Sequence, residues 1–169
     1  GKPDGRLDAR YVGIKENRLN QYAITDPQSD AIAPAYTVGF LDYLYGDLGV
    51  SKNLNYKTSA GVDPDFRWDW SHKGNKGWGT QIAINTSNDM ASAMSKDPNL
   101  KVLIMNGYAN LATVFYGVEH TLDHMNLAPK IRENITMTYY ESGHMMYIHP
   151  PSMIQFKTDL KLFIEATLK

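Results

Sequence analysis

Apolar positions are most regular in the C-terminal part of the chain. Residues 102–105 form a continuous apolar run, as expected of a buried parallel strand. Residues 135–140 are β-branched and aromatic, which is typical of strands. Between them, residues 111–127 carry apolar side chains at helical spacing. The apolar side of this predicted helix consists of Phe115, Val118, Leu122 and Met125.

A second helix is predicted after residue 151. Ser152 and Gln155 have the spacing of a capping box, in which each side chain accepts a hydrogen bond from the other residue's backbone N–H. The inward face of the helix that they open is predicted to consist of Met153, Phe156, Leu160, Phe163 and Ile164. The order strand, helix, strand, helix predicts two parallel strands joined by a right-handed crossover. The fold class is therefore predicted to be α/β.

The first part of the chain is less regular. A turn at residues 26–30 precedes a helix over residues 31–48, where apolar residues recur at helical spacing. Residues 51–79 hold Gly, Asp, Pro, Lys and all three Trp, and predict an irregular loop. Residues 85–96 predict a short helix. The charged run over residues 2–10 is expected to be solvated.

Composition narrows the possible partners. The chain has 169 residues, which suits one domain, and 17 basic against 18 acidic residues, which leaves no basic surplus for nucleic acid. No apolar run approaches the ~18–20 residues of a membrane span. We therefore expect neither a nucleic-acid nor a membrane partner. Zero cysteines exclude disulfides, thiolate metal sites and cysteine nucleophiles. Because the chain opens without an initiator Met or a signal sequence, we expect it to be a piece of a longer protein.

Candidate chemistry lies where the two predicted strands end, because ligands bind at the carboxyl ends of the strands in an open α/β sheet. The loops at these ends are residues 106–115 and residues 141–152. The second loop contains His144, directly after a glycine at the strand exit. A histidine there is well placed to act as a general base, since its pKa lies near neutral pH. A purely structural role for a loop histidine is the alternative.

Five segments resemble one family. They are GRLDARYVG (5–13), RWDW (67–70), LKVLIMNGYANLATVF (100–115), EHTLDHMNL (119–127) and ITMTYYESGHMMYIHPPS (135–152). The last is the most specific, with a Tyr pair, an acid, Gly-His-Met-Met-Tyr and a second His in that order. In these segments the chain resembles the bacterial serine carboxypeptidases, which are peptidases of the α/β-hydrolase fold.

The resemblance covers almost the whole chain and implies the C-terminal part of an α/β-hydrolase. Residues 1–100 would form a cap or insertion region with helices that leads into the core. Residues 101–169 would form the last core strands and helices. The family releases C-terminal residues from peptides through an acyl-enzyme, and the resemblance implies a peptide substrate, no cofactor and a periplasmic or secreted location.

The resemblance also assigns site residues. His144 matches the general base, and Met145 matches a residue near the leaving-group pocket, with simple packing as its alternative role. The family's nucleophilic Ser lies in a G-x-S-x-G turn, which this sequence does not contain. The nucleophile, its half of the sheet and the oxyanion-hole donors are therefore missing from this sequence. We expect the chain to be inactive alone.

The acid of the triad is also replaced. The family pattern at the first strand exit is close to Gly-Tyr-Tyr-Asp-Leu-Ala-Thr-Pro, whereas residues 107–114 are Gly-Tyr-Ala-Asn-Leu-Ala-Thr-Val. Asn110 therefore stands at the triad Asp position, where it cannot stabilise an imidazolium by charge and can hold the histidine in the wrong tautomer. Three explanations are open. The substitution is natural, it is engineered, or another carboxylate acts as the acid of the triad. The candidates for another acid are Glu141, Asp123 and Glu119. Alternatively, Asn110 simply caps a helix starting at Leu111.

Three functions remain open at this point. The first is a piece of a serine carboxypeptidase-like hydrolase. The second is a degenerate, non-catalytic relative that binds peptides or a partner protein. The third keeps the fold but changes the reaction to that of an esterase or acyltransferase. A piece with two core strands would expose a sheet edge and an apolar face. We therefore expect the missing N-terminal half of the parent enzyme, or a second copy of the chain, to cover them.

Two further patterns suggest candidate sites. His120 and His124 are spaced i and i+4, as zinc ligands on a helix can be, but the zincin pattern requires Glu where Thr121 stands. A surface helix without metal is the expected interpretation. The three Trp residues, Trp68, Trp70 and Trp78, either line a substrate wall in the cap or fix an irregular loop to the core.

Overall fold

A computed structural model describes residues 2–13, 26–54, 56–59, 65–74, 77–80 and 85–168. The chain divides into two compact units. The first unit joins Gly1–Asp30 to Thr86–Lys169, and the second comprises Ala31–Asn85. Residues near the N-terminus therefore belong to the same unit as the C-terminal strands. Each unit is considered by itself.

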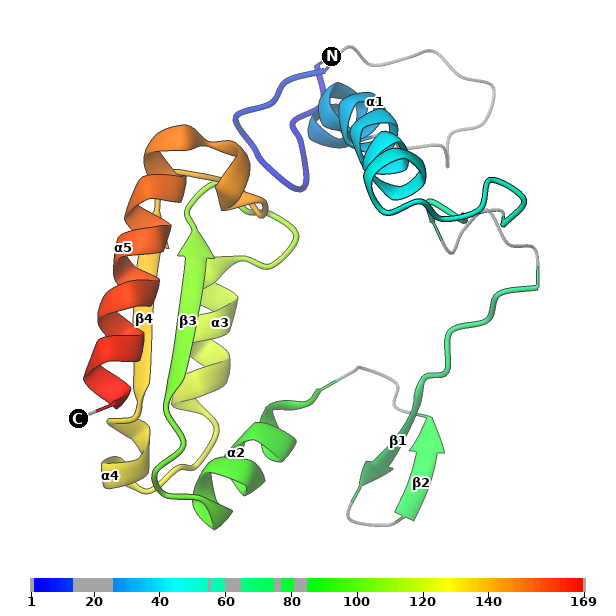
Figure 1. Cartoon of the computed structure of the whole chain (residues 1–169). Coiled ribbons are helices and arrows are strands. Elements are labelled where there is room, and N and C mark those ends of the chain that lie inside the picture. Colours follow the sequence, from blue (N-terminus) through cyan, green and yellow to red (C-terminus); the bar gives the residue numbers. More distant parts are fainter. Residues whose placement is uncertain are drawn as a thin grey trace. The chain divides into compact units, whose positions relative to one another are not determined.

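The first unit contains the predicted alternation of strands and helices (Figure 1). Its elements are α2 (Ser87–Lys96), β3 (Val102–Gly107), α3 (Phe115–Asp123), α4 (Pro129–Arg132), β4 (Ile135–Tyr140), the 3₁₀ turn η3 (Met146–Ile148) and α5 (Pro150–Thr167). β3 and β4 pair in parallel, in a register that runs from Val102 opposite Ile135 to Gly107 opposite Tyr140. The structure is mixed helix and sheet, which is compatible with the predicted α/β class, and the predicted parallel pair is confirmed. Both strands end at the same edge of the small sheet.

Successive residues at the end of β4 direct their side chains to opposite faces of the sheet. Tyr139 contacts α3, where its hydroxyl donates a hydrogen bond to Glu119 Oε1 at 2.5 Å and its ring lies 6.1 Å from that of Phe115. Tyr140 is fully buried and contacts α5, where its hydroxyl donates to Asp159 Oδ2 at 2.9 Å. Helices α3 and α5 therefore cover opposite faces of the strand pair (Figure 1).

The start of α5 differs from the sequence-based prediction. The N-cap residue is His149, and Pro150 and Pro151 occupy the first helical positions. Proline suits these positions because its missing N–H would have no intrahelical partner. Ser152 lies inside the first turn, where its hydroxyl shares a 2.7 Å hydrogen bond with His149 Nδ1. The predicted capping box of Ser152 and Gln155 is therefore wrong.

The apolar residues of α5 are only partly covered. Phe156, Leu160 and Phe163 are half-buried, as the predicted inward face requires. Met153 and Ile164, assigned to the same face, are each 47% exposed, so this part of the prediction is wrong. Other exposed large apolar side chains of the first unit are Val12, Leu100, Tyr108, Leu111, Val114, Tyr116, Tyr147, Ile154, Leu162 and Leu168. The first unit, taken by itself, leaves considerable apolar surface in solvent.

Helix α1 (Pro27–Asp42) begins in the first unit, and most of it belongs to the second. It continues as a π-helical turn, η1 (Tyr43–Asp47), and ends near Gly49, whose φ of 62° is left-handed and favours glycine. The helix predicted over residues 31–48 is confirmed, with an earlier start.

The segment predicted as an irregular loop contains a hairpin. Strand β1 (Ser71–Gly74) pairs antiparallel with β2 (Gly77–Thr80), so the prediction is wrong for its C-terminal end. Trp68 and Trp70 precede the hairpin with ring centroids 5.7 Å apart, and their side chains are 62% and 52% exposed. These two side chains contact each other in solvent and do not fix the loop to a core. The side chain of Trp78 lies outside the described part.

Replacing Tyr140 by Phe tests the packing of α5 on β4. The substitution removes the hydroxyl that bonds to Asp159 and Thr138 (2.9 Å each) and leaves both groups without this partner. We expect the free energy of unfolding, measured with urea, to fall by about 1–2 kcal/mol. Tyr116→Phe, at an exposed position on α3, is the matched control and should change it by less than about 0.5 kcal/mol. Equal losses in both variants would contradict the assignment.

The two tyrosines also predict how stability depends on pH. The Glu119 carboxylate next to the Tyr139 hydroxyl raises the pKa of Tyr139 to about 12, and burial raises the pKa of Tyr140 to about 12. Unfolded tyrosine has a pKa near 10, so the folded state holds these protons more tightly. Their contribution to stability is complete below pH ~10 and is lost as pH rises toward 12. Urea unfolding between pH 9 and 12 should show this loss. The double variant Tyr139→Phe/Tyr140→Phe should show less of it, and an unchanged slope would count against the prediction.

Candidate active site

The exits of β3 and β4 are held together by backbone hydrogen bonds. Tyr108 N–H donates to the Tyr140 carbonyl at 3.0 Å, and Ala109 N–H donates to the Ser142 carbonyl at 2.9 Å. Gly107 lies so close to the second loop that a Cβ on it would come within 2.5 Å of the Ser142 carbonyl oxygen. The close approach explains the glycine and brings the two loops together in a fixed register.

Asn110 is buried at the centre of this junction. Its Oδ1 accepts hydrogen bonds from the backbone N–H groups of Ala112 and Thr113, both at 3.0 Å. Only the oxygen of the amide can accept, so these two donors fix the orientation of the side chain. Its Nδ2 therefore faces Thr113 Oγ1 at 2.6 Å and His144 Nδ1 at 3.2 Å.

This orientation determines the tautomer of His144. An amide nitrogen can only donate, so His144 Nδ1 must accept, and the single proton of the neutral ring lies on Nε2. The Thr113 hydroxyl, 3.4 Å from the same Nδ1, is also able to donate to it. A general base of the serine-hydrolase type needs the reverse arrangement, with the proton on Nδ1 and a free Nε2. The contact therefore holds His144 in the tautomer that cannot accept a proton at Nε2.

The helix-capping alternative for Asn110 is wrong. Helix α3 begins at Phe115, four residues later than Leu111, and its N-cap residue is Val114. Asn110 instead caps the tight turn that leads into residues 111–113. The side chain thus stabilises the loop and contacts the histidine at the same time.

In the described part of the chain, none of the three alternative acids is a hydrogen-bond partner of the His144 ring. Glu119 accepts the Tyr139 hydroxyl, and Asp123 forms an ion pair with Arg132 at 2.8 Å. Glu141 is exposed. Within the described ranges, the hydrogen-bond partners of the His144 ring are Asn110 and Thr113, and neither is a carboxylate.

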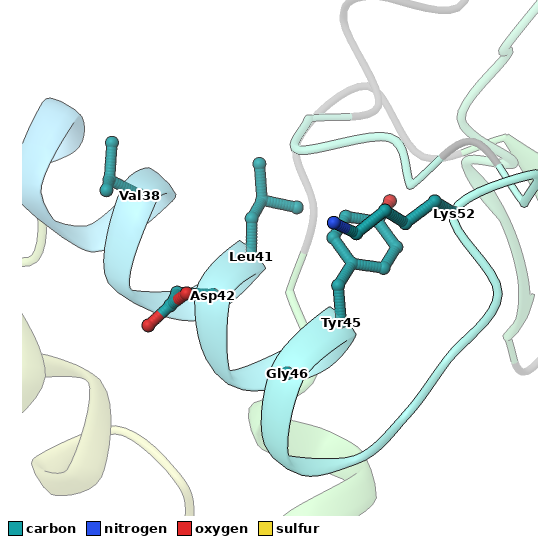
Figure 2. Close-up of a pocket in the computed structure, with 6 residues that line it drawn as sticks. All are labelled: Val38, Leu41, Asp42, Tyr45, Gly46 and Lys52. Atoms are coloured by element: carbon teal, nitrogen blue, oxygen red, sulfur yellow. The ribbon is translucent and has the colours of Figure 1, made fainter.

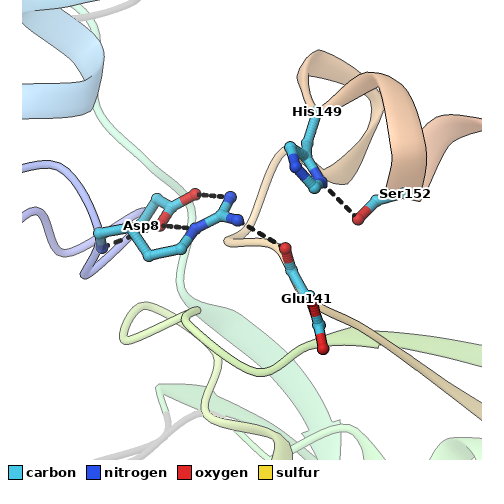
Figure 3. Close-up of polar contacts among 5 residues, drawn as sticks. Asp8, Glu141, His149 and Ser152 are labelled. Carbon is cyan, nitrogen blue, oxygen red and sulfur yellow. Dashed lines mark hydrogen bonds and ion pairs between the residues drawn. The ribbon is translucent and has the colours of Figure 1, made fainter.

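His144, Met145 and His149 differ in their exposure and contacts. The His144 side chain itself is exposed, and Met145 is half-buried at the residue that precedes η3. The role of Met145 near a leaving group stays a prediction. His149 ends the loop as the N-cap of α5, with its ring bonded to Ser152 (Figure 3).

Sequence reasoning missed the contribution of the N-terminal segment. Asp8 is fully buried and forms an ion pair with Arg10 at 2.7 Å, so the expectation that this charged run is solvated is wrong for Asp8. Arg10 Nη1 also donates to the backbone carbonyl of Glu141 at 2.5 Å (Figure 3). Burial raises the pKa of Asp8, but the hydrogen bonds and charge of Arg10 and the N–H of Gly143 outweigh it and hold that pKa below its usual value. The available signal was an Asp and an Arg two residues apart inside a segment that carries the family resemblance.

Other candidate chemistry is weaker. The rings of His120 and His124 stack with centroids 4.0 Å apart on an exposed helix end, and His124 Nδ1 donates to the His120 carbonyl at 2.7 Å. In the part of the chain with described coordinates, no three His, Cys, Asp or Glu side chains gather as a metal site would require. None of the described helices combines the length and apolar character needed to cross a membrane.

A shallow depression of about 530 Å³ lies within the second unit, along α1 and η1 (Figure 2). Its lining residues are Val38, Leu41, Asp42, Tyr45, Gly46 and Lys52. It contains none of the predicted catalytic residues. Tyr36 and Phe40, on the apolar side of the same helix, are exposed and line a second depression.

Comparison of the chain with protein-family models, with curated proteins and with solved structures finds no match.

Replacing Asn110 by Asp tests the tautomer assignment. One carboxylate oxygen should keep the two backbone hydrogen bonds of Asn110 Oδ1, while the other now accepts from His144 Nδ1. We therefore expect the proton of neutral His144 to move from Nε2 in the unmodified chain to Nδ1 in Asn110→Asp. Long-range ¹H–¹⁵N NMR of the imidazole distinguishes the two tautomers. Asn88→Asp, on the exposed start of α2, adds the same charge elsewhere and should leave the tautomer unchanged. Nδ1–H in the unmodified chain would overturn the assignment.

Proposed function

We propose that this chain is the C-terminal portion of a serine carboxypeptidase-like hydrolase of the α/β-hydrolase fold. The observation that supports it most is the 3.2 Å contact between Asn110 Nδ2 and His144 Nδ1 at the exits of two adjacent parallel strands. In α/β-hydrolases the acid follows the nucleophile along the chain and the histidine comes last, each at a strand exit. The order and placement of residues 110 and 144 agree with the last two of these positions.

The proposed reaction assigns one role to each position. With an acid at position 110, a Ser Oγ would attack the carbonyl of the last peptide bond, and His144 Nε2 would take its proton and deliver it to the leaving amine. The acyl-enzyme is then hydrolysed by water, which His144 activates in the same way. Met145 would lie beside the released C-terminal residue. The sequence contains no G-x-S-x-G turn, so the proposal requires the Ser to come from outside it.

The proposal also names what covers the open surfaces. In the described ranges β3 and β4 form a two-stranded sheet, and apolar side chains of α5 such as Ile154 and Leu162 are exposed. The missing N-terminal half of the parent enzyme would add strands to the sheet and bury these side chains. A second copy of the chain is the alternative partner.

The presence of Asn110 at the acid position favours a catalytically inactive chain. Asn110 carries no charge to stabilise an imidazolium, and it holds His144 with the proton on Nε2. In trypsin, the corresponding Asp-to-Asn change lowers kcat by about 10⁴-fold. The same contact therefore favours a second candidate, a non-catalytic relative that keeps the site to bind peptides or a partner protein.

A carboxypeptidase assay on the complete gene product tests the proposal, with blocked dipeptides at acidic and neutral pH. We expect Asn110→Asp to raise kcat by about 10³–10⁴-fold over the unmodified protein, because it restores both the charge and the Nδ1–H tautomer. Asn88→Asp is the control for added charge and should have no effect.

The outcomes separate the candidates. Activity that appears only with Asn110→Asp supports a hydrolase disarmed at its acid position. Full activity of the unmodified protein would mean that Asn110 does not stand at the acid position. Inactivity of both, with the Asn110→Asp tautomer confirmed by NMR, would contradict the hydrolase assignment and leave peptide binding as the function to test.

A further inference from the structure

We infer that residues 6–10, here called the N-terminal segment, position His144, with Asp8 and Arg10 as the positioning residues. The segment is distant in sequence from both loops of the site, and it hydrogen-bonds to each of them. The description of His144 as the proton-transferring group rests on the proposed function, whereas the contacts that follow do not.

Backbone hydrogen bonds connect the segment to both strand exits. Ala9 N–H donates to the Ala109 carbonyl at 2.9 Å, and Leu111 N–H donates to the Arg6 carbonyl at 3.0 Å. These two bonds lie on either side of Asn110. On the other loop, the N–H of His144 itself donates to the Leu7 carbonyl at 2.7 Å. The segment therefore fixes the backbone of both side chains that meet at the site.

Asp8 provides the charged anchor. Its carboxylate accepts from Arg10 at three points, the backbone N–H (3.0 Å), Nε (2.9 Å) and Nη2 (2.7 Å). Gly143 lies directly against Asp8, and its backbone N–H helps to lower the pKa of that carboxyl. A fully buried carboxylate needs this number of donors to remain ionised. Because Gly143 precedes His144, the same carboxylate holds the peptide that carries the histidine.

Arg10 extends the anchor to the start of the loop. While two nitrogens of its guanidinium hold Asp8, its Nη1 donates to the Glu141 carbonyl, immediately after β4. A planar guanidinium can bond in two directions at once, which a lysine ammonium cannot reproduce with the same geometry. The ion pair thus holds the loop at Glu141 and at Gly143.

The fit around Gly143 is close. A Cβ on this residue would overlap Asp8 Cβ and would lie 2.5 Å from the Leu7 carbonyl oxygen. The loop can approach the segment closely enough for the His144 N–H to reach Leu7 only because residue 143 has no side chain. On the far side, Asp26 Oδ2 accepts the N–H groups of Arg6 and Leu7, at 2.6 and 3.0 Å, and holds the start of the segment.

Amide hydrogen exchange tests the inference in the full chain. In Asp8→Asn, one carboxylate oxygen becomes an NH₂ group that faces the donors of Arg10 or Gly143, so the segment should detach locally. We expect the His144 amide to exchange at least about 10-fold faster relative to the Ile104 amide of β3, which serves as the internal reference. Asp123→Asn breaks an equally short but exposed ion pair with Arg132 and is the matched control. It should leave the ratio unchanged.

A second variant covers the case in which Asp8→Asn does not fold. Arg10→Lys keeps the charge but loses the two-directional contact, and it should raise the same exchange ratio by a smaller factor. An unchanged ratio in a folded Asp8→Asn or Arg10→Lys variant would overturn the inference. So would equal acceleration at His144 and Ile104, because this would show only a general loss of stability.

The assay separates this inference from the proposed function. In an active Asn110→Asp gene product, adding Asp8→Asn should lower kcat and leave KM nearly unchanged, since the histidine is displaced and peptide contacts are kept. If exchange at His144 accelerates but no variant turns over peptide, the positioning role stands and the hydrolase proposal fails. If Asn110→Asp is active and Asp8→Asn alters neither exchange nor kcat, the hydrolase proposal stands and the positioning role fails.

Discussion

The parallel register of β3 and β4 is the constraint on which the site depends. Because Gly107 lies opposite Tyr140, both strands end at the same level, and the loops that follow them must leave the sheet side by side. The absence of a side chain at Gly107 then lets these loops touch. A shift of one residue in the register would turn the side chains of β4 to the other face and separate Tyr139 from α3 and Tyr140 from α5. The contact between residues 110 and 144 is a consequence of this pairing.

At residue 110, an aspartate and an asparagine share the same shape but differ in what they offer to a histidine. The Ala112 and Thr113 N–H groups would be satisfied by either side chain, so the turn alone does not distinguish them. The two side chains differ at their second terminal atom. In asparagine this atom is Nδ2, which donates a hydrogen bond, and in aspartate it is Oδ2, which accepts one. A substitution that costs the fold little can therefore reverse the proton position on His144. The loop geometry therefore does not by itself decide on which nitrogen His144 carries its proton.

The sequence predicted what local patterns determine. The continuous apolar run of β3, the β-branched and aromatic composition of β4 and the helical spacing of the apolar residues of α3 are all local features, and the parallel pairing followed from their order. The predictions failed where contacts between distant residues decide the outcome. Asp8 was expected in solvent because no local pattern shows that Arg10 and Gly143 surround it. Ser152 matches the capping pattern, but the two prolines before it begin α5 earlier and place it inside the first turn.

The N-terminal segment shows why such a contact matters energetically. Arg10 and Glu141 are separated by 131 residues, so bringing them together has a large entropic cost that local hydrogen bonds alone do not offset. Here the contact combines an ion pair whose carboxylate is buried, three backbone hydrogen bonds to the site loops and close packing at Gly143. A buried carboxylate with one donor removed is strongly destabilised, so loss of the Arg10 donors would destabilise the contact at Asp8. The orientation of His144 therefore depends on the N-terminal segment as well as on the two strand exits.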